Sequence, residues 1–329
     1  MKGIQVLDRP ASQSFYAVAG RLLFIESFDR DLAILIELLF ARWQLTPVSF
    51  RERNPDIKIS FSSCEELPAI PRGLSEFEVA AGGRCYTAGD EYYLSFQQSL
   101  LHLRTGNPLS VSVWISDPTD VELARVTSFA VCAALRRFGL FELHSAGVVV
   151  PETDAGVLIV GPSGSGKSTL TLQLASAGWG YLSDDEVLLS VVDEQVEARG
   201  FRSFFALAPA AVGAAAPVSA FKTCFEPADV LPTPPVQRTV PRFLLFTTIS
   251  RGKETLLHEL TQAETMVRLI RACPWASYDT AVARPNLELL SKVARQAKGF
   301  DLSAGTDLLK LGNASRIIGA RVSGVNDGD

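Results

Sequence analysis

Hydrophobic and polar residues alternate in short runs over the first third of the chain. Two runs in residues 15–25 are separated by Gly20, and further runs follow at 58–61, 76–80, 84–87, 92–96 and 109–115. Alternation with a period of two is typical of strands that bury one face. Residues 32–43 have helical spacing instead. The pattern predicts a smaller N-terminal α+β domain over residues 1–139, and we expect this domain to recognise a substrate or partner.

A long helix is predicted over residues 120–138, at the end of that domain. Apolar residues recur at helical spacing, at Val121, Leu123, Val126, Phe129, Ala130, Ala133 and Leu135. Thr119 and Glu122 have the spacing of a capping box at its start, and Gly139 provides a stop at its end. We interpret this helix as the bridge to a second domain over residues 140–320.

The second domain alternates apolar runs with helical patterns, which is typical of an α/β fold. Strands are expected at residues 141–150, 157–160, 187–192, 196–199, 243–249, 256–260 and 300–302, and helices at 168–177, 266–272 and 286–297. Residues 207–223 are rich in Ala and Pro, and prolines are dense over 227–241, so a loop or lid is expected there. The polar tail after Gly319 is predicted to fray.

The apolar run at 157–160 leads directly into the sequence GPSGSGKS, residues 161–168. This matches the phosphate-binding loop G-x-x-x-x-G-K-[ST], between a strand and a helix as the motif requires. Glycines let the backbone N–H groups surround a phosphate, and the helix directs its positive end at the same group. Lys167 supplies a charge for the β- and γ-phosphates, and the Ser168 hydroxyl is placed for Mg²⁺. The predicted ATP-binding residues are Gly161, Ser163, Gly164, Ser165, Gly166, Lys167, Ser168 and Thr169.

Two adjacent aspartates, Asp184 and Asp185, follow a short predicted strand at 181–182. A nucleoside triphosphate site needs an acidic group for Mg²⁺ and, if a hydroxyl is phosphorylated, a carboxylate that accepts its proton. Successive strand side chains face opposite ways unless the backbone turns, so the pair could supply both groups. The alternative is a solvated acidic turn without a role in catalysis.

These motifs together resemble the core of the HPr kinase/phosphorylase superfamily, which also includes ATP-dependent phosphoenolpyruvate carboxykinase. In that superfamily a paired-aspartate motif follows the phosphate loop one helix later, and a histidine precedes the loop, as in Leu143-His144-Ser145-Ala146-Gly147. The resemblance is specific over residues 141–200 and vaguer to about residue 311. Outside this span there is a general likeness to HPr kinase-related bacterial proteins, including kinases of biosynthetic precursor peptides.

The resemblance implies roles for individual residues. Asp184, as the first aspartate of the pair, would be the catalytic base, with Asp185 and Ser168 holding Mg²⁺. The sequence does not orient the two aspartates, so these roles could be exchanged. His144 and Lys167 would act beside the γ-phosphate.

A weaker likeness concerns the residues after the aspartates. Glu197-Ala198-Arg199-Gly200 is similar to the E-x-R-G part of a family signature but lacks its glycine-rich continuation, so Glu197 is either a metal ligand or part of a salt-bridged edge strand. Arg238 and Arg242 flank the proline-dense stretch. They are candidates to grip phosphates or the acceptor, although most surface arginines are simply solvated.

Composition excludes several classes of protein. The 329 residues carry a net charge of -5, so the excess of basic side chains that general nucleic-acid binding needs is absent. The five cysteines are dispersed, without metal-ligand spacing, which favours reduced thiols in a cytoplasmic protein. The start of the chain lacks an apolar signal core, and the most apolar window, residues 32–40, is too short to span a membrane.

The sequence therefore predicts an ATP- and Mg²⁺-dependent kinase that acts on a serine or threonine of a protein or peptide. A small-molecule kinase related to the carboxykinases and a non-catalytic ATP-binding regulatory module are the alternatives. A transporter-type ATPase would need an LSGGQ-type signature, which the chain lacks. The acceptor, the reverse phosphorolysis reaction and the oligomeric state, a homo-oligomer included, are left open.

Overall fold

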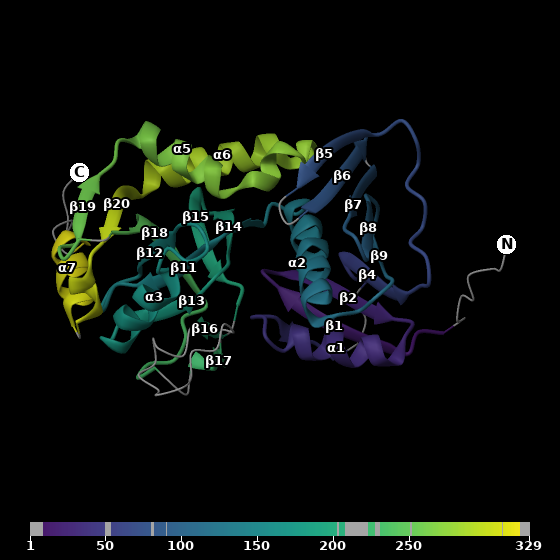
Figure 1. Ribbon diagram of the computed structural model, residues 1–329, viewed down its shortest axis with the longest axis horizontal. Coiled ribbons are helices and arrows are strands. Elements are labelled where there is room, and N and C mark those ends of the chain that lie inside the picture. The colour runs from purple at the N-terminus through teal and green to yellow at the C-terminus, as the bar shows by residue number, and fades with distance from the viewer. Residues whose placement is uncertain are drawn as a thin grey trace. The chain divides into compact units, whose positions relative to one another are not determined.

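The structure, a computed structural model, describes residues 9–49, 54–79, 82–89, 91–202, 204–207, 223–227, 231–250, 252–310 and 312–322. It is a mixed α/β fold that divides into two compact units. Unit 1 comprises Met1–Phe141 and Pro274–Arg284, and unit 2 comprises Glu142–Cys273 and Pro285–Asp329. Figure 1 labels their elements.

Unit 1 contains a nine-stranded sheet in the order β3-β1-β2-β4-β9-β8-β7-β6-β5. Its strands are β1 (Ser12–Val18), β2 (Arg21–Ser27), β3 (Thr46–Pro47), β4 (Ile57–Ser63), β5 (Ser75–Val79), β6 (Gly83–Ala88), β7 (Glu91–Ser95), β8 (Ser99–Arg104) and β9 (Leu109–Ile115). Helices α1 (Arg30–Phe40) and α2 (Asp120–Arg136) pack against it. The predicted alternation is clear in β4, where Ile57, Ile59 and Phe61 are fully buried and the residues between them are partly exposed.

Residues 274–284 belong to unit 1, although the sequence analysis placed them in the second domain. The carboxylate of Asp279 accepts hydrogen bonds from Arg136, at 2.6 Å, and from Arg137. Trp275 stacks on Phe141 with ring centroids 5.8 Å apart and lies under the Arg136 guanidinium. This segment therefore returns to unit 1 because a buried ion pair and an aromatic contact, both remote in sequence, hold it there.

Unit 2 is built on a mixed sheet that contains both parallel and antiparallel strand pairs. Its elements, with two that cross the unit boundary, are β10 (Phe141–Leu143), β11 (Ser145–Val149), β12 (Ala155–Val160), α3 (Lys167–Ser176), β13 (Gly180–Ser183), β14 (Val187–Val192), β15 (Gln195–Gly200), β16 (Phe205–Leu207), β17 (Thr223–Phe225), β18 (Arg238–Ile249), β19 (Leu256–Glu259), α5 (Gln262–Ala272), α6 (Thr280–Gln296), β20 (Lys298–Ala304) and α7 (Asn313–Val322). Strand β12 runs parallel to β18, and β18 runs parallel to β20. The carboxyl ends of these three strands therefore meet at one edge of the sheet.

The core of unit 2 lies between this sheet, α3 and α7. Val157, Ile159 and Leu245 of the sheet pack in one cluster with Leu174 of α3 and Ile318 of α7. The apolar run predicted as a strand at 157–160 is buried along its length in β12, as expected for a strand covered on both faces.

Two predictions for unit 2 were wrong. The proline-dense stretch does not remain a loop to residue 241, because β18 already begins at Arg238; Pro241 is accommodated at a register shift against β12, where a ladder hydrogen bond is not required. Residues 208–222 and 228–230 of the predicted lid lie outside the described residues. The polar tail begins later than predicted, because α7 extends through Gly319 to Val322 and is anchored by the Trp179 Nε1 bond to Ser315, at 3.0 Å.

None of the helices in the described ranges combines the length and the apolar run that a membrane crossing needs.

Candidate nucleotide site

The loop between β12 and α3, residues 161–166, has a shape that requires glycine. Gly164 has φ +82° and Gly166, the N-cap of α3, has φ +90°, a region in which other side chains are strained. A Cβ atom on Gly161 would lie 2.5 Å from Ser165 Oγ. The loop therefore combines a left-handed turn with a close backbone approach, as a phosphate-binding loop does.

The side chain of Ser165 ties this loop to the neighbouring strand β18. The Thr247 hydroxyl donates to the carbonyl of Val160 at 3.4 Å, and its oxygen lies 3.0 Å from Ser165 Oγ. The backbone N–H of Ser165 donates to Pro162 O at 3.2 Å. Since Ser165 and Thr247 are both buried, these bonds hold the loop in one position against the sheet. The sequence contained no signal for Thr247.

The N-terminus of α3 carries no side-chain cap. Among the described helices, α1, α2 and α5 each begin after a residue whose side chain accepts a backbone N–H, namely Asp29, Thr119 and Thr261. The first N–H groups of a helix have no partner inside it and carry partial positive charge. Ser163 is exposed, and Ser168 and Thr169 in the first turn are partly exposed. The uncapped amides and these hydroxyls are suited to bind an anion.

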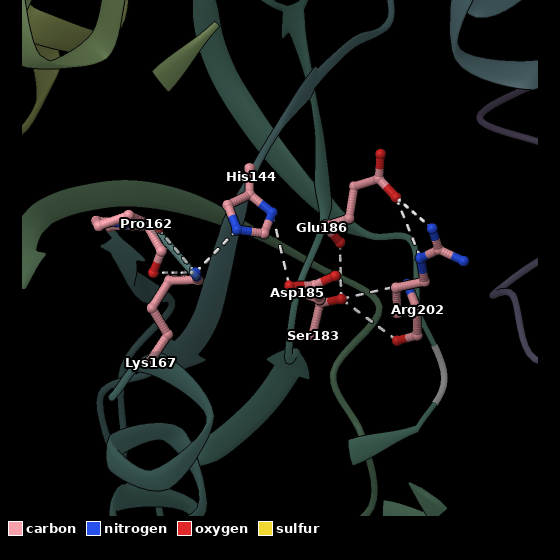
Figure 2. Close-up of polar contacts among 8 residues, drawn as sticks. His144, Pro162, Lys167, Ser183, Asp185, Glu186 and Arg202 are labelled. Carbon is pink, nitrogen blue, oxygen red and sulfur yellow. Dashed lines mark hydrogen bonds and ion pairs between the residues drawn. The ribbon is translucent and has the colours of Figure 1, made fainter. Parts of the chain in front are cut away.

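The side chain of Lys167 is buried and holds the loop from inside. Its Nζ donates to the carbonyl oxygens of Gly161, at 2.8 Å, and Pro162, at 3.2 Å, and lies 2.9 Å from His144 Nε2 (Figure 2). An ammonium group has donors only. His144 Nε2 therefore accepts this bond, which places the proton of the neutral imidazole on Nδ1.

Nδ1 of His144 faces Asp185. It lies 3.6 Å from Asp185 Oδ1, and Figure 2 shows the imidazole between the lysine and the carboxylate. Strand pairing explains the proximity: His144 precedes β11, whose Ser145 is opposite Val160, and Asp185 follows β13, whose Ser183 is opposite Gly147. Lys167, His144 and Asp185 thus form one polar chain beside the loop, in which Lys167 is buried and the side chains of His144 and Asp185 are about half exposed.

The two aspartates differ in exposure. Asp184 is 1% exposed, whereas the Asp185 side chain is 53% exposed. Burial, reinforced by the negative charge of Asp184, raises the pKa of the Tyr181 hydroxyl, which therefore stays neutral. The turn after β13 presents Asp185 to the solvent beside His144 and directs Asp184 into the protein.

A set of contacts that sequence reasoning missed fixes this turn. The Ser183 hydroxyl donates to Glu186 O at 2.7 Å and accepts from the backbone N–H of Arg202 at 3.2 Å. The Arg202 guanidinium in turn pairs with the Glu186 carboxylate at 3.0 Å. Figure 2 shows these bonds on the side of the turn away from His144. Ser183 and Glu186 flank the aspartates in sequence, but Arg202 carries no local signal.

Glu197 does not lie with these residues. It stands opposite Ser190, three residues beyond the start of β14 and so about 10 Å along the strand from its first residue. Its carboxylate pairs with Arg238 at 3.4 Å and with Arg199 at 4.0 Å. The contacts are those of the salt-bridged strand that the sequence analysis offered as the alternative to a metal ligand.

Arg238 and Arg242 also lie away from the phosphate-loop end of the sheet. Val240 and Pro241 are opposite Ala155 and Gly156, at the amino end of β12, and the loop begins only at residue 161, roughly 15–20 Å further along the strand. Arg242 lies 3.5 Å from the Gln195 side chain. These arginines are not placed to grip a phosphate held by the loop.

The described residues include no group of three or more His, Cys, Asp or Glu side chains that could hold a metal ion. Mg²⁺ does not need three protein side chains, because it keeps several waters and binds through one or two protein oxygens together with phosphate. Ser168, in the first turn of α3, and Asp185, exposed beside His144, are oxygen ligands of the required kind. The residues present therefore fit a magnesium-bound triphosphate.

Comparison with known proteins adds one distant likeness. No family model and no curated protein matches the chain. Solved structures that align with it include the Hpr(Ser) kinase/phosphatase from Coxiella burnetii, at 13% identity and a TM-score of 0.33, over 55% of this chain and 97% of that one. A TM-score of this size does not establish a shared fold.

Proposed function

We propose that the chain is an ATP-dependent kinase of the HPr kinase/phosphorylase type, which transfers the γ-phosphate to a serine or threonine hydroxyl of a protein or peptide. The observation that carries this proposal is the polar chain from Lys167 through His144 to Asp185, at 2.9 and 3.6 Å, beside a glycine loop and an uncapped helix. A loop that only binds a nucleotide has no need of an accessible histidine and carboxylate aligned on its lysine.

The loop and α3 would hold the phosphates. Bound Mg²⁺-ATP supplies the phosphoryl group and neutralises part of its charge. The backbone N–H groups of residues 163–168 are donors for the β- and γ-phosphates, and the Ser168 hydroxyl is the ligand for the metal ion. Lys167 Nζ would exchange one of its three bonds, to Gly161 O, Pro162 O and His144 Nε2, for a phosphate oxygen. His144, with Nε2 turned to Lys167, keeps the ammonium in position at the end of β12.

We assign the base to Asp185 rather than to Asp184. A general base has to come within hydrogen-bond distance of the proton that it accepts, and Asp184 is 1% exposed. The oxygen of the acceptor hydroxyl would bond to the γ-phosphorus while the bond from that phosphorus to ADP breaks. Asp185 would take the proton that this hydroxyl releases. This differs from the family resemblance, which implies Asp184 as the base and Asp185 as a magnesium ligand.

The proposal is tested by measuring Mg²⁺-ATP affinity and transfer of ³²P from γ-labelled ATP to a library of serine- and threonine-containing peptides. Lys167→Ala should lose most ATP affinity. Asp185→Asn should keep that affinity and lose roughly 10²–10⁴-fold in transfer rate, as expected for removal of a general base. Lys292→Ala, at a lysine of α6 that pairs with the exposed Glu194, is the matched control and should behave as wild type.

Other outcomes separate the alternatives. Tight ATP binding without labelling of any peptide or metabolite would indicate the regulatory module, and labelling of metabolites alone would indicate a small-molecule kinase. If Asp184→Asn abolishes transfer while Asp185→Asn retains it, the assignment of the base is wrong. Absence of ATP binding by the wild type would refute the proposal as a whole.

A further inference from the structure

A cavity adjoins the phosphate loop on one side of α3. It has a volume of about 170 Å³ and lies at the carboxyl ends of β18 and β20, where ligands of parallel sheets collect. Ser165 and Gly166 of the loop form one end of it, and Thr169 and Gln173 continue the same face of α3. The cavity therefore begins at the phosphate loop and extends away from it along the helix.

The cavity is lined mainly by apolar side chains, two of which are unusually exposed. Ile249, the last residue of β18, is 65% exposed, and Leu309 is 67% exposed. Both line the cavity, together with the buried side chains of Leu302 and Leu308. Large apolar side chains left open at the mouth of a pocket indicate a surface that a ligand covers.

The outer wall of the cavity is rigid. Residues 304–309 are bonded to the chain that follows β18: Ser250 N donates to Ala304 O at 2.9 Å, and Thr306 N donates to Gly252 O at 3.2 Å. The Thr255 hydroxyl accepts from Gly305 N at 3.0 Å. The pocket is thus formed before any ligand arrives, because both of its walls are held by hydrogen bonds that a ligand does not use.

We infer that this cavity binds the base of the nucleotide whose phosphates the adjacent loop holds. This inference rests on the proposed function. A whole nucleotide does not fit in 170 Å³, since pockets for drug-sized ligands measure roughly 300–1,000 Å³, but an apolar cavity of about 150 Å³ accepts a single aromatic ring such as benzene. A planar nucleobase matches this size and the apolar lining.

The position of polar groups agrees with a base. Gln173 offers an amide that can both donate and accept, and Ser250 and Thr306 offer hydroxyls at the mouth. Ile249 and Leu309 contact the faces of the ring. Burial of the base in the apolar cavity and binding of the phosphates by the loop thus contribute separately to the affinity for ATP. A ligand that has the phosphates but no base measures the second contribution alone.

The experiment compares two probes, Mg²⁺-ATP and Mg²⁺-tripolyphosphate, by calorimetry. The Ile249→Ser/Leu309→Ser double variant should bind ATP at least about tenfold more weakly, because apolar contacts with the ring are lost, and should bind tripolyphosphate as the wild type does. Both side chains are mainly exposed, so the fold is retained. Leu256→Ser, at a half-exposed leucine of β19 that does not line the cavity, is the matched control and should change neither affinity.

Two results would overturn the inference in different ways. If the double variant binds ATP as tightly as the wild type does, the base lies elsewhere, although the loop still holds the phosphates. If the double variant loses affinity for both probes equally, the substitutions have disturbed the loop and the cavity has no role of its own. Failure of the proposed function is recognised separately: either the wild type binds neither probe and Lys167→Ala changes nothing, or it binds ATP without transferring phosphate to any peptide.

Discussion

At the scale of single residues, burial decides what the same side chain does. Asp184 and Asp185 are neighbours in sequence, yet one is 1% exposed and the other has a half-exposed carboxylate beside His144. Asp279 is also 1% exposed and serves only to neutralise arginines. The chemistry of a carboxylate therefore follows from its surroundings, which strand pairing and packing create.

Cys85 allows a test of such an environment by pH. Burial, together with the charge of Asp279, raises the pKa of the thiol from 9.0 to about 12. The folded thiol is thus neutral where the unfolded thiol ionises, so its contribution to stability is complete below pH 9 and is lost as the pH rises toward 12. Between pH 9 and 10, the free energy of unfolding should fall more steeply in wild type than in Cys85→Ala, by at most about 1.4 kcal/mol per pH unit.

Urea denaturation at successive pH values measures this difference. Equal slopes in the two proteins would show that Cys85 ionises in the folded state as readily as in the unfolded state. The native thiol should also resist a thiol-specific reagent at pH 8, because only the thiolate reacts and Cys85 is fully buried.

At the scale of elements, the helices α1, α2 and α5 begin with a side-chain cap, whereas α3 begins without one. Helix α5 has a complete capping box: Thr261 Oγ1 accepts from Glu264 N, and Glu264 accepts from Thr261 N at 2.8 Å. Helix α3 begins instead at Gly166 and has no side-chain cap. The uncapped start of α3 lies beside the polar chain of Lys167, His144 and Asp185.

Removal of the α5 cap should cost stability. Thr261→Ala leaves the Glu264 N–H without its acceptor, and such substitutions lower the free energy of unfolding by about 1 kcal/mol. Thr261→Ser keeps the hydroxyl and should stay within a few tenths of a kcal/mol of wild type. Urea midpoints compare the three proteins, and a loss of equal size in the serine variant would mean that the methyl group, not the cap, is responsible.

At the scale of the whole molecule, the boundaries of the units do not follow the order of the chain. Unit 1 is completed by residues 274–284, which stand between α5 and the rest of α6 in sequence. Asp279, which lies in this segment, contacts Arg136 and Arg137, about 140 residues earlier in the chain. A contact of this range has no periodic or local signature, so a division at residue 139 missed it.

Asp279→Asn should destabilise unit 1 strongly. The change keeps the shape of the side chain but leaves the Arg136 guanidinium, which is 0% exposed, without its counter-charge. Loss of one partner of a buried ion pair typically costs about 3–5 kcal/mol. Asp301→Asn removes an aspartate that pairs with Arg268 where both side chains are one-third exposed, and it should cost less than about 1 kcal/mol.

Denaturation curves decide between these expectations. A similar, small loss in both variants would show that the charge of Asp279 is compensated by other groups. A large loss in Asp279→Asn alone would support the view that this segment holds unit 1 together.

Much of the local structure could be predicted because it depends on neighbours in the chain. The alternation at residues 57–61, the helix that ends before Gly139 and the strand–loop–helix at 155–176 were all evident from spacing and from glycine positions. Helix α7 was missed because Gly319 resembles a stop, although Ala314, Ile318 and Val322 have helical spacing and are buried. Pro241 was misread because the register shift that accommodates it involves another strand.

By itself, the sequence determined the phosphate-loop motif, the two aspartates and the helix caps, because each depends on residue types within a few positions of one another. The tertiary structure decided that Asp185 rather than Asp184 faces His144, that Glu197 pairs with Arg238, and that a cavity lies beside the loop. These follow from pairing between β11, β12, β13, β15, β18 and β20, since hydrogen-bonded strands bring together side chains whose distance in the sequence carries no information about their distance in space.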